Sequence, residues 1–219
     1  MNGGARRPLR FLVTAGPTRE AIDPVRYLSN RSSGKMGYAL AAAAKRYGTV
    51  VLVSGPTALK APPGVKRISI ISARQMRSAA LRACRGADVI IQCAAVADYA
   101  PSRPSARKIK KSGATLTLRL KRTPDILSEM ARLKKPGQLL VGFAAETNDL
   151  ERNALGKLRR KRLDAIVANR VGLSDVGMES DENACVLIRS DGRKSRFART
   201  TKTRLARMLL KELLKEKFR

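Results

Sequence analysis

Short apolar runs alternate with helix-like segments along most of the chain. The runs expected to form strands are RFLVTAG (10–16), VVLVSGP (50–56), DVIIQCAAVAD (88–98), QLLVGFAAET (138–147) and DAIVAN (164–169). Segments with helical spacing of apolar residues fall between them, at 34–48, 73–85 and 148–162. Strands that are almost continuously apolar are typical of parallel sheets covered on both faces. The pattern therefore predicts an α/β fold with an open, mostly parallel sheet and helices on both faces.

Two segments depart from this alternation. Residues 114–122 (ATLTLRLKR) alternate with period two, which predicts a half-exposed strand. Residues 183–198 read as two short strands around an Asp-Gly turn, which predicts a β-hairpin and hence a small antiparallel extension of the sheet. A final helix follows, whose apolar stripe is expected at Leu205, Met208, Leu209 and Leu213.

The 219 residues suit one domain over 1–219, with residues 1–9 expected to be flexible and 100–113 to form a mobile active-site loop. No apolar run approaches the roughly 18 residues of a membrane span, and the first one, FLV, is too short for a signal peptide. The three cysteines, Cys84, Cys93 and Cys185, are odd in number and lack C-x-x-C spacing. These features favour a reducing, cytoplasmic location and free thiols.

The chain contains no histidine, which excludes histidine-based catalytic triads and histidine-ligated zinc. Its formal net charge is +29, which fits either nucleic-acid binding or a small anionic substrate. Only 4% of the residues are aromatic, so platforms for stacking nucleic-acid bases are scarce. A basic nucleic-acid-binding α/β protein stays open as an alternative at this point.

The stretch YLSNRSSGKMGYALA (27–41) resembles a phosphate-binding loop that leads into a helix. It does not match the Walker A pattern, because Ser29 takes the place of the first glycine and Met36 that of the final Ser/Thr. Gly34 and Gly37 give only part of the dinucleotide fingerprint, which argues against the other alternative, an NAD(P)-dependent Rossmann oxidoreductase.

The chemistry of this stretch nevertheless suits an anion. Serine hydroxyls, a glycine that allows close approach and the N-terminus of a helix together favour a bound phosphate. Asn30 can both donate and accept hydrogen bonds next to such a group. The alternative is purely structural, with a serine capping the helix that begins near Gly34.

Further candidates follow the other predicted strands. Asp98 ends the run 88–98 and could bond a ribose hydroxyl or a base edge. Lys108 lies in a loop rich in proline and serine, from which a cation could close over a polyphosphate. Lys157 and Lys161 are four residues apart, so they share one helix face. They could both reach a phosphate or a base oxygen, or simply face water. Cys93 lies within a predicted buried strand and is expected to be structural.

Six motifs occur in a fixed order and carry a resemblance to a known family. They are AGPTREAIDPVRYLSNRSSGKMGYALA, CAAVADYAP, KIKK, TPDIL, VGFAAET and DAIVAN. Together they closely resemble phosphopantothenate–cysteine ligase of coenzyme A biosynthesis, over roughly residues 10 to 217. The resemblance implies a Rossmann-like fold and a homodimer. It also implies that CTP activates the carboxylate of 4′-phosphopantothenate as an acyl-cytidylate with release of pyrophosphate, after which the amine of L-cysteine attacks and CMP leaves.

The resemblance also implies residue roles. Asn30 and Lys108 are expected to be catalytic, and the substrate is expected to contact Arg26, Asn30 and Ala95. The nucleotide-binding residues it implies are Ser32, Gly34, Gly37, Ala94, Asp98, Lys108, Pro124, Asp125, Ile126, Leu127, Phe143, Lys157 and Lys161. Residues 16–26 are expected at a dimer interface, from which Arg26 would reach the partner's substrate. Mg²⁺ is expected to accompany the triphosphate, and no protein side chain is assigned to it.

Two features limit the resemblance. Bacterial members are commonly fused behind a flavin-dependent decarboxylase domain, but only about ten residues precede the first predicted strand here, so we expect no flavin and a separate decarboxylase as a possible partner. Some members use ATP. The CAAVADY motif and the lysine pair Lys157/Lys161 favour CTP. No specific nucleic-acid partner and no membrane association are expected.

Overall fold

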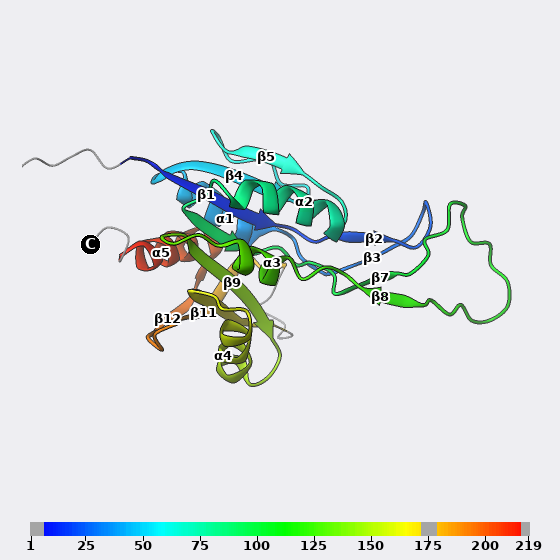
Figure 1. The fold of residues 1–219 in the computed structure, drawn as a ribbon. Helices are drawn as coiled ribbons and strands as arrows, with labels where there is room; N and C mark the ends of the chain where they lie inside the picture. Colours follow the sequence, from blue (N-terminus) through cyan, green and yellow to red (C-terminus); the bar gives the residue numbers. More distant parts are fainter. Residues whose placement is uncertain (1–6, 172–178, 216–219) are drawn as a thin grey trace, which may run out of the picture.

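The computed structural model describes residues 7–171 and 179–215, and its centre is an eight-stranded sheet (Figure 1). In spatial order the strands are β12 (Lys194–Thr201), β11 (Glu182–Arg189), β10 (Ala165–Arg170), β9 (Leu139–Glu146), β6 (Val89–Gln92), β1 (Leu9–Ala15), β4 (Gly48–Ser54) and β5 (Lys66–Ser69). The strands from β10 to β5 pair in parallel, and β11 and β12 add an antiparallel edge. The predicted mostly parallel sheet with an antiparallel hairpin extension is confirmed.

Helices cover both faces of the sheet, as predicted. One face packs against α1 (Lys35–Ala44) and α5 (Lys202–Leu214), and the other against α2 (Ala73–Cys84), α3 (Ile126–Leu133) and α4 (Leu150–Arg160). Within β1, Phe11 and Val13 belong to the core under α1 and α5, whereas Leu12 belongs to the core under α2 and α3. This alternation explains why the strands read as continuous apolar runs.

The order of the six parallel strands places the ligand site. From β5 to β10 the order is that of a Rossmann fold, with the direction of winding reversing between β1 and β6. Ligands of such sheets bind beyond the carboxyl ends of the strands at this reversal. The residues that follow Ala15 and Gln92 are therefore expected to frame a site.

Two small antiparallel ladders project from that end of the sheet (Figure 1). Strand β2 (Arg19–Ala21) pairs with β3 (Tyr27–Ser29), and β7 (Tyr99–Pro101) pairs with β8 (Leu120–Arg122). Residues 102–119 form the long loop between β7 and β8. We call residues 19–29 and 99–122 the arm.

The strand predicted at 114–122 is largely wrong, because only Leu120–Arg122 form a strand. Leu116 is 54% exposed and Leu120 43%, so no layer formed by residues 7–171 or 179–215 covers the apolar side of this segment. Alternating polarity without a covering layer does not hold a segment in a sheet.

Other sequence predictions need smaller corrections. Strand β6 ends at Gln92, so Cys93 follows the strand rather than lying within it. Met208 was expected on the buried stripe of α5 but is 39% exposed, because the buried stripe runs through Leu205, Leu209 and Leu213 and their neighbours. All three cysteines are free thiols, as predicted.

The predicted flexibility of 1–9 concerns mainly residues outside the described ranges. Leu9 already begins β1, and the Arg7 guanidinium donates two hydrogen bonds to the Asp88 carboxylate, at 2.7 and 3.1 Å. Within the described ranges, no helix has the length and apolar character needed to cross a membrane.

Gly37 allows the first turn of α1 to lie directly against β1. A Cβ at this position would lie 2.5 Å from the Cβ of Ala15 and 3.1 Å from the carbonyl oxygen of Thr14. Both neighbours belong to the buried central strand and cannot yield easily. Gly37→Ala is therefore expected to destabilise the protein by about 1–3 kcal/mol, despite the better helix propensity of alanine.

Thermal unfolding tests this expectation against Gly86→Ala. A Cβ at Gly86 meets no atom within 4 Å, so this variant should melt at or slightly above the wild-type temperature. The Gly37 variant should melt several degrees lower, since each kcal/mol shifts the midpoint by roughly 2–4 °C at this chain length. Equal midpoints for the two variants would show that α1 tolerates displacement from β1.

Candidate functional site

Two adjoining cavities open beyond the carboxyl ends of the parallel strands, with volumes of about 420 and 350 Å³. Residues lining both of them are Ala94, Val96, Asp98, Phe143 and Lys157. The two cavities are therefore halves of one cleft, joined over the residues that follow β6 and the middle of β9. We call them the first and the second cavity.

The N-terminus of α3 and one face of α4 form a wall of the first cavity. Asp125 caps α3 by accepting a hydrogen bond from the backbone N–H of Ser128 at 3.1 Å. Its carboxylate also accepts a hydrogen bond from Nζ of Lys161 at 2.8 Å, which links α3 to α4. Burial alone would raise the pKa of Asp125, but the bonds from Lys161 and Ser128 outweigh it and lower the pKa below its ordinary value.

Lys157 lies between the two cavities. Its Nζ donates a hydrogen bond to the carbonyl oxygen of Phe143 at 2.8 Å, which holds the ammonium group over the middle of β9. Burial lowers the pKa of Lys157, and the neighbouring charge of Lys161 lowers it further. An anion bound here would offset both effects, so the position suits a phosphate or another negatively charged group.

The loop before α1 lines the second cavity. Gly34 is the N-cap residue of α1, in a left-handed conformation with a φ of 79°, and no side chain caps the helix. The purely structural alternative, a serine cap, is therefore wrong. The Ser32 hydroxyl instead accepts a long hydrogen bond, 3.4 Å, from the backbone N–H of Gly34. The N–H groups of the first turn of α1 are left without a side-chain cap, as in helix termini that bind anions.

Asn30 connects this loop to the segment after β6. Its Nδ2 donates a hydrogen bond to the carbonyl oxygen of Ala95 at 3.1 Å, and both residues line the second cavity. The side chain is otherwise exposed, so its Oδ1 is accessible to a ligand. Asn30 thus lies near the residues shared by the two cavities.

Most of the residues expected to form the site do line the cleft. Those lining the first cavity are Ala94, Asp98, Pro124, Asp125, Ile126, Leu127, Phe143, Lys157 and Lys161. Those lining the second are Asn30, Ser32, Gly34, Gly37, Ala94, Ala95, Asp98, Phe143 and Lys157. Arg26 and Lys108 line neither cavity and lie in the arm.

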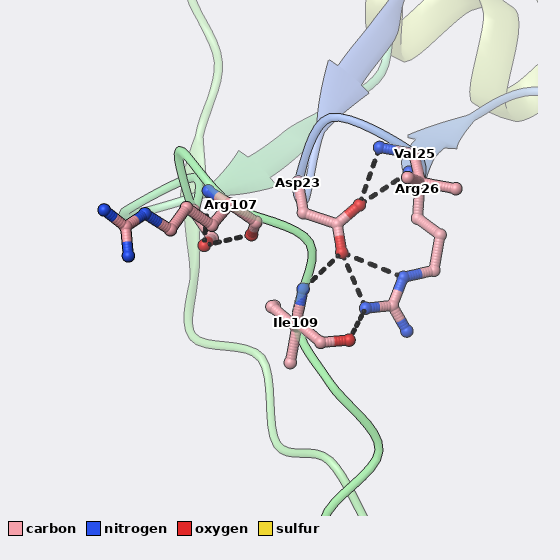
Figure 2. A network of polar contacts seen from close by, with 6 residues as sticks. Asp23, Val25, Arg26, Arg107 and Ile109 are labelled. Atoms are coloured by element: carbon pink, nitrogen blue, oxygen red, sulfur yellow. Dashed lines mark hydrogen bonds and ion pairs between the residues drawn. The ribbon is translucent and has the colours of Figure 1, made fainter.

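A buried carboxylate, Asp23, fastens the long loop of the arm to the β2–β3 hairpin (Figure 2). Its Oδ1 accepts the backbone N–H groups of Val25 and Arg26, both at 2.8 Å. Its Oδ2 accepts Nη2 of Arg26 at 2.6 Å and the backbone N–H of Ile109 at 3.1 Å. Arg26 also donates to the carbonyl oxygen of Ile109 at 3.0 Å, so the residue next to Lys108 is held from both sides.

Asp23→Asn is expected to release this part of the loop. The Arg26 hydrogen bond lowers the pKa of Asp23 far below its usual range, so the carboxylate is charged at every ordinary pH. An amide in its place has one acceptor oxygen too few, so it turns an N–H₂ group toward the N–H of Ile109 or toward the turn at Val25. Amide hydrogen exchange should become faster around Ile109, with the sheet core unchanged.

Acid should act in the same direction as the substitution. The pKa of Asp23 is lower in the folded protein than in the unfolded chain. Its contribution to stability is therefore complete above the unfolded pKa of about 4 and is lost as the pH falls below that value. Asp191→Asn, in the β11–β12 turn, is the matched control and should leave exchange in the arm at its wild-type rate. Unchanged exchange around Ile109 in Asp23→Asn would contradict the proposed fastening.

Sequence reasoning missed part of the cleft. The residues it missed are Lys35, Met36, Gln92, Cys93, Val96, Tyr99, Arg122, Thr123, Ala145, Asn169, Asn183 and Lys202. Several of them, such as Val96, Ala145 and Asn169, lie at the carboxyl ends of predicted strands, so their position at this edge of the sheet was available as a signal. Asn183 and Lys202 come from the antiparallel extension and α5, where nothing in the pattern pointed to a ligand. Burial raises the pKa of Cys93 to about 12, which favours the neutral thiol and supports the predicted structural role.

Comparisons with known proteins place these features in a family. Residues 7–217 match the model of the DNA/pantothenate metabolism flavoprotein C-terminal domain. The coenzyme A biosynthesis bifunctional protein CoaBC of Vibrio cholerae is 49% identical over 189 residues, which are 85% of this chain and 47% of the relative. The CoaBC protein of Escherichia coli K12 is 46% identical over 210 residues, covering 94% of this chain and 52% of the relative. The chain thus spans about half the length of these curated relatives.

Solved structures share the fold. A crystal structure of the C-terminal domain of CoaBC superposes with a TM-score of 0.79 at 42% identity, covering 94% of this chain and 93% of that one. A Cab2 variant in complex with phosphopantothenate-cysteine superposes with a TM-score of 0.77 at 14% identity, covering 95% of this chain and 86% of that one, which shows a common fold. With almost its whole length matched, the chain belongs to the family of the DNA/pantothenate metabolism flavoprotein C-terminal domain.

Proposed function

We propose that the protein is a phosphopantothenate–cysteine ligase of coenzyme A biosynthesis, which uses CTP to join 4′-phosphopantothenate to L-cysteine. The observation that carries the proposal is the divided cleft, in which Lys157 lines both cavities and Asn30 lines the second. A ligase that activates a carboxylate with a nucleotide must bring two anionic substrates together at one phosphorus atom. Family membership and the CoaBC relatives support the same reaction.

In this proposal the first cavity binds the nucleoside. Asp98 is exposed at its rim and suits the ribose hydroxyls, while the α3 cap segment around Asp125 and the Lys157/Lys161 pair face the base and the α-phosphate. The preference for CTP over ATP rests on the CAAVADY motif and this lysine pair. Pyrophosphate release measured with each nucleotide decides between them.

The second cavity then holds the phosphates and the carboxylate that attacks. The uncapped N-terminus of α1, Ser32 and the backbone at Gly34 provide donors for phosphate oxygens. Asn30 and the backbone of Ala95 would hold the acyl-cytidylate while the cysteine amine attacks its carbonyl carbon. The protein contributes mainly positioning and charge stabilisation, which agrees with the absence of histidine.

Mg²⁺ would enter with the triphosphate. Over the described ranges, no group of three or more Asp, Glu, Cys or His side chains is arranged to hold a metal ion. When bound, the ion would neutralise phosphate charge.

The arm is proposed to complete the site of a partner subunit in a homodimer. Arg26 and Lys108 lie outside the cavities of their own chain, although the family resemblance gives both a role at the substrate. The arm also exposes several apolar side chains, among them Val25, Tyr27 and Tyr99, which a partner would cover. We also propose that the protein works in the cytoplasm, where a separate decarboxylase could be its partner.

Pyrophosphate release tests the function. With CTP, Mg²⁺ and 4′-phosphopantothenate the protein should release pyrophosphate in a burst, and addition of L-cysteine should give continuous turnover with formation of CMP. Pantothenate without its phosphate serves as the matched control substrate. Absence of pyrophosphate release with both CTP and ATP would refute the ligase reaction.

A further inference from the structure

Helix α5 begins with a lysine in an unfavourable position. Lys202 is only 5% exposed, although it is the first residue of the helix, where the helix dipole repels a positive charge. Burial lowers the pKa of Lys202, and the charge of Lys35 lowers it further. Cys93 and Asp181 act in the opposite direction on this pKa. An anion in the adjoining cavity would further stabilise an ammonium group buried at a helix start.

Lys202 reaches the second cavity together with two buried amides. Asn183 is 4% exposed and Asn169 is 9% exposed, and all three residues line this cavity. Oδ1 of Asn183 accepts the backbone N–H of Ala184 at 3.0 Å, whereas its Nδ2 has no partner among the described residues. The rest of this residue is buried, so its N–H₂ group is left to face the cavity, where a ligand oxygen could accept a hydrogen bond from it.

A bulge in the sheet lies next to Asn183 and helps to turn its side chain toward the cavity. The register between β11 and β12 shifts between Asn183 and Cys185, next to the start of α5. Bulges often turn a side chain out of the regular alternation toward a functional site. The backbone N–H of Lys202 is also held, by the carbonyl oxygen of Asp181 at 2.9 Å, so the ammonium and the amide project from a fixed framework.

The topology brings a second positive helix end to the same place. Strand β12 runs antiparallel to β11, which runs antiparallel to β10, so β12 ends at the carboxyl edge of the parallel strands. Helices α1 and α5 therefore both begin at this edge, and they pack side by side on one face of the sheet. Of the neighbouring charges, Lys35 is paired with Asp181 at 2.6 Å, and Asp98 lies across the cavity.

We infer that Lys202 and Asn183 bind the β- and γ-phosphates of the nucleotide. This inference rests on the proposed function. In the first step the substrate carboxylate forms a bond to the α-phosphorus, the bond from that phosphorus to the bridging oxygen breaks, and pyrophosphate leaves with the electron pair. Lys202, Asn183 and the start of α1 form the donor-rich end of the cleft away from the nucleoside cavity, where the most highly charged part of the nucleotide would lie.

Direct binding tests this assignment without the need for turnover. Lys202→Met should weaken Mg²⁺-dependent binding of CTP and of inorganic pyrophosphate by roughly 10- to 100-fold, the range for one hydrogen bond to a charged group. It should leave the affinity for CMP unchanged, since CMP lacks both phosphates. Lys202→Arg should restore most of the affinity. Lys211→Met, on the exposed side of the same helix, is the control and should bind all three ligands as the wild type does.

Asn183→Ala provides a second, independent variant, which retains the lysine. It should weaken pyrophosphate binding by about three- to tenfold and leave CMP binding unchanged. If it binds pyrophosphate as the wild type does, the assignment is overturned, whether or not Lys202→Met folds. Equal losses for CTP and CMP in Lys202→Met would also overturn it.

Steady-state kinetics separates the possible sources of the anion. The inference expects the KM for CTP to rise in Lys202→Met. A rise confined to the KM of phosphopantothenate or of cysteine would assign the anion to that substrate and overturn the inference. If the wild-type protein binds neither CTP nor ATP and releases no pyrophosphate, the proposed function fails instead, which is a distinct result.

Discussion

Lys108→Gln is expected to reduce the rate of pyrophosphate release by about 10²- to 10³-fold, the usual effect of removing one group that stabilises transition-state charge. Lys108 is exposed on the long loop of the arm and forms no ion pair with any residue that the structure describes, so its charge is available to a ligand. Its neighbour Ile109 is fastened to Asp23 and Arg26, which places the lysine on an anchored stretch of an otherwise irregular loop. Glutamine keeps the length of the chain and removes only the charge.

Single-turnover release of pyrophosphate from CTP is the measurement. Arg103→Gln removes an equal charge from the same exposed loop, where Arg103 forms no hydrogen bond or ion pair with another described residue. This variant should stay within about threefold of the wild type, as surface substitutions usually do. If both variants slow the reaction equally, the loop contributes only general electrostatics. Normal pyrophosphate release in Lys108→Gln would remove Lys108 from the first step.

If the protein forms the proposed homodimer, mixed dimers would show which cavity Lys108 serves. Lys157→Met disables the cavity and Lys108→Gln disables the arm, so each homodimer should be inactive. If the arm acts on the partner subunit, random mixing leaves about one site in four with both residues intact, and activity returns to about a quarter of the wild-type level. If the arm acts on its own chain, every site carries one defect and mixing restores nothing.

The sheet and its helices could be predicted because burial on both faces of the sheet restricts the strand residues to apolar types. A strand such as β1, with Phe11 and Val13 buried under one helical layer and Leu12 under the other, must be apolar throughout. The Asp-Gly turn at 191–192 is similarly determined by local conformation, since Gly192 has a φ of 89°. These features depend on neighbours in the sequence or on the sheet as a whole.

The arm and the far end of the second cavity depend on contacts distant in sequence. Residues 114–119 have the alternation of a strand but no layer to cover them, which no local pattern records. Asn183 and Lys202 come together through a bulge and a helix start in a segment that reads as an ordinary hairpin and an ordinary helix. The sequence predicts a place in the cleft for Asp98, Asn30 and Lys157, because they follow strands or lie in motifs of the family. The burial of Lys202, in contrast, follows only from the packing of α5 on α1.

Asn30→Asp is expected to let the acyl-cytidylate accumulate. Nδ2 of Asn30 donates to the carbonyl oxygen of Ala95, and this bond ties the loop before α1 to the segment after β6. An aspartate has no such donor. Its carboxylate would be repelled by the carbonyl oxygen of Ala95 and turn away from it. The added negative charge would also lie beside the phosphate of the intermediate. We expect the attack of cysteine to slow by about 10²-fold, as for loss of a positioning hydrogen bond, and pyrophosphate release by less than about tenfold.

Rapid-quench experiments with CTP labelled in the α-phosphate follow both steps at once. In the wild type the labelled acyl-cytidylate should disappear on addition of cysteine as fast as the product forms, whereas in Asn30→Asp it should persist. Asn148→Asp adds the same charge at an exposed position outside both cavities and should behave as the wild type. Since Lys108→Gln should form almost no intermediate, the two variants must differ in what accumulates. If both stop before pyrophosphate release, Asn30 and Lys108 serve the same step, and the bond from Asn30 to Ala95 positions the carboxylate for its attack on CTP.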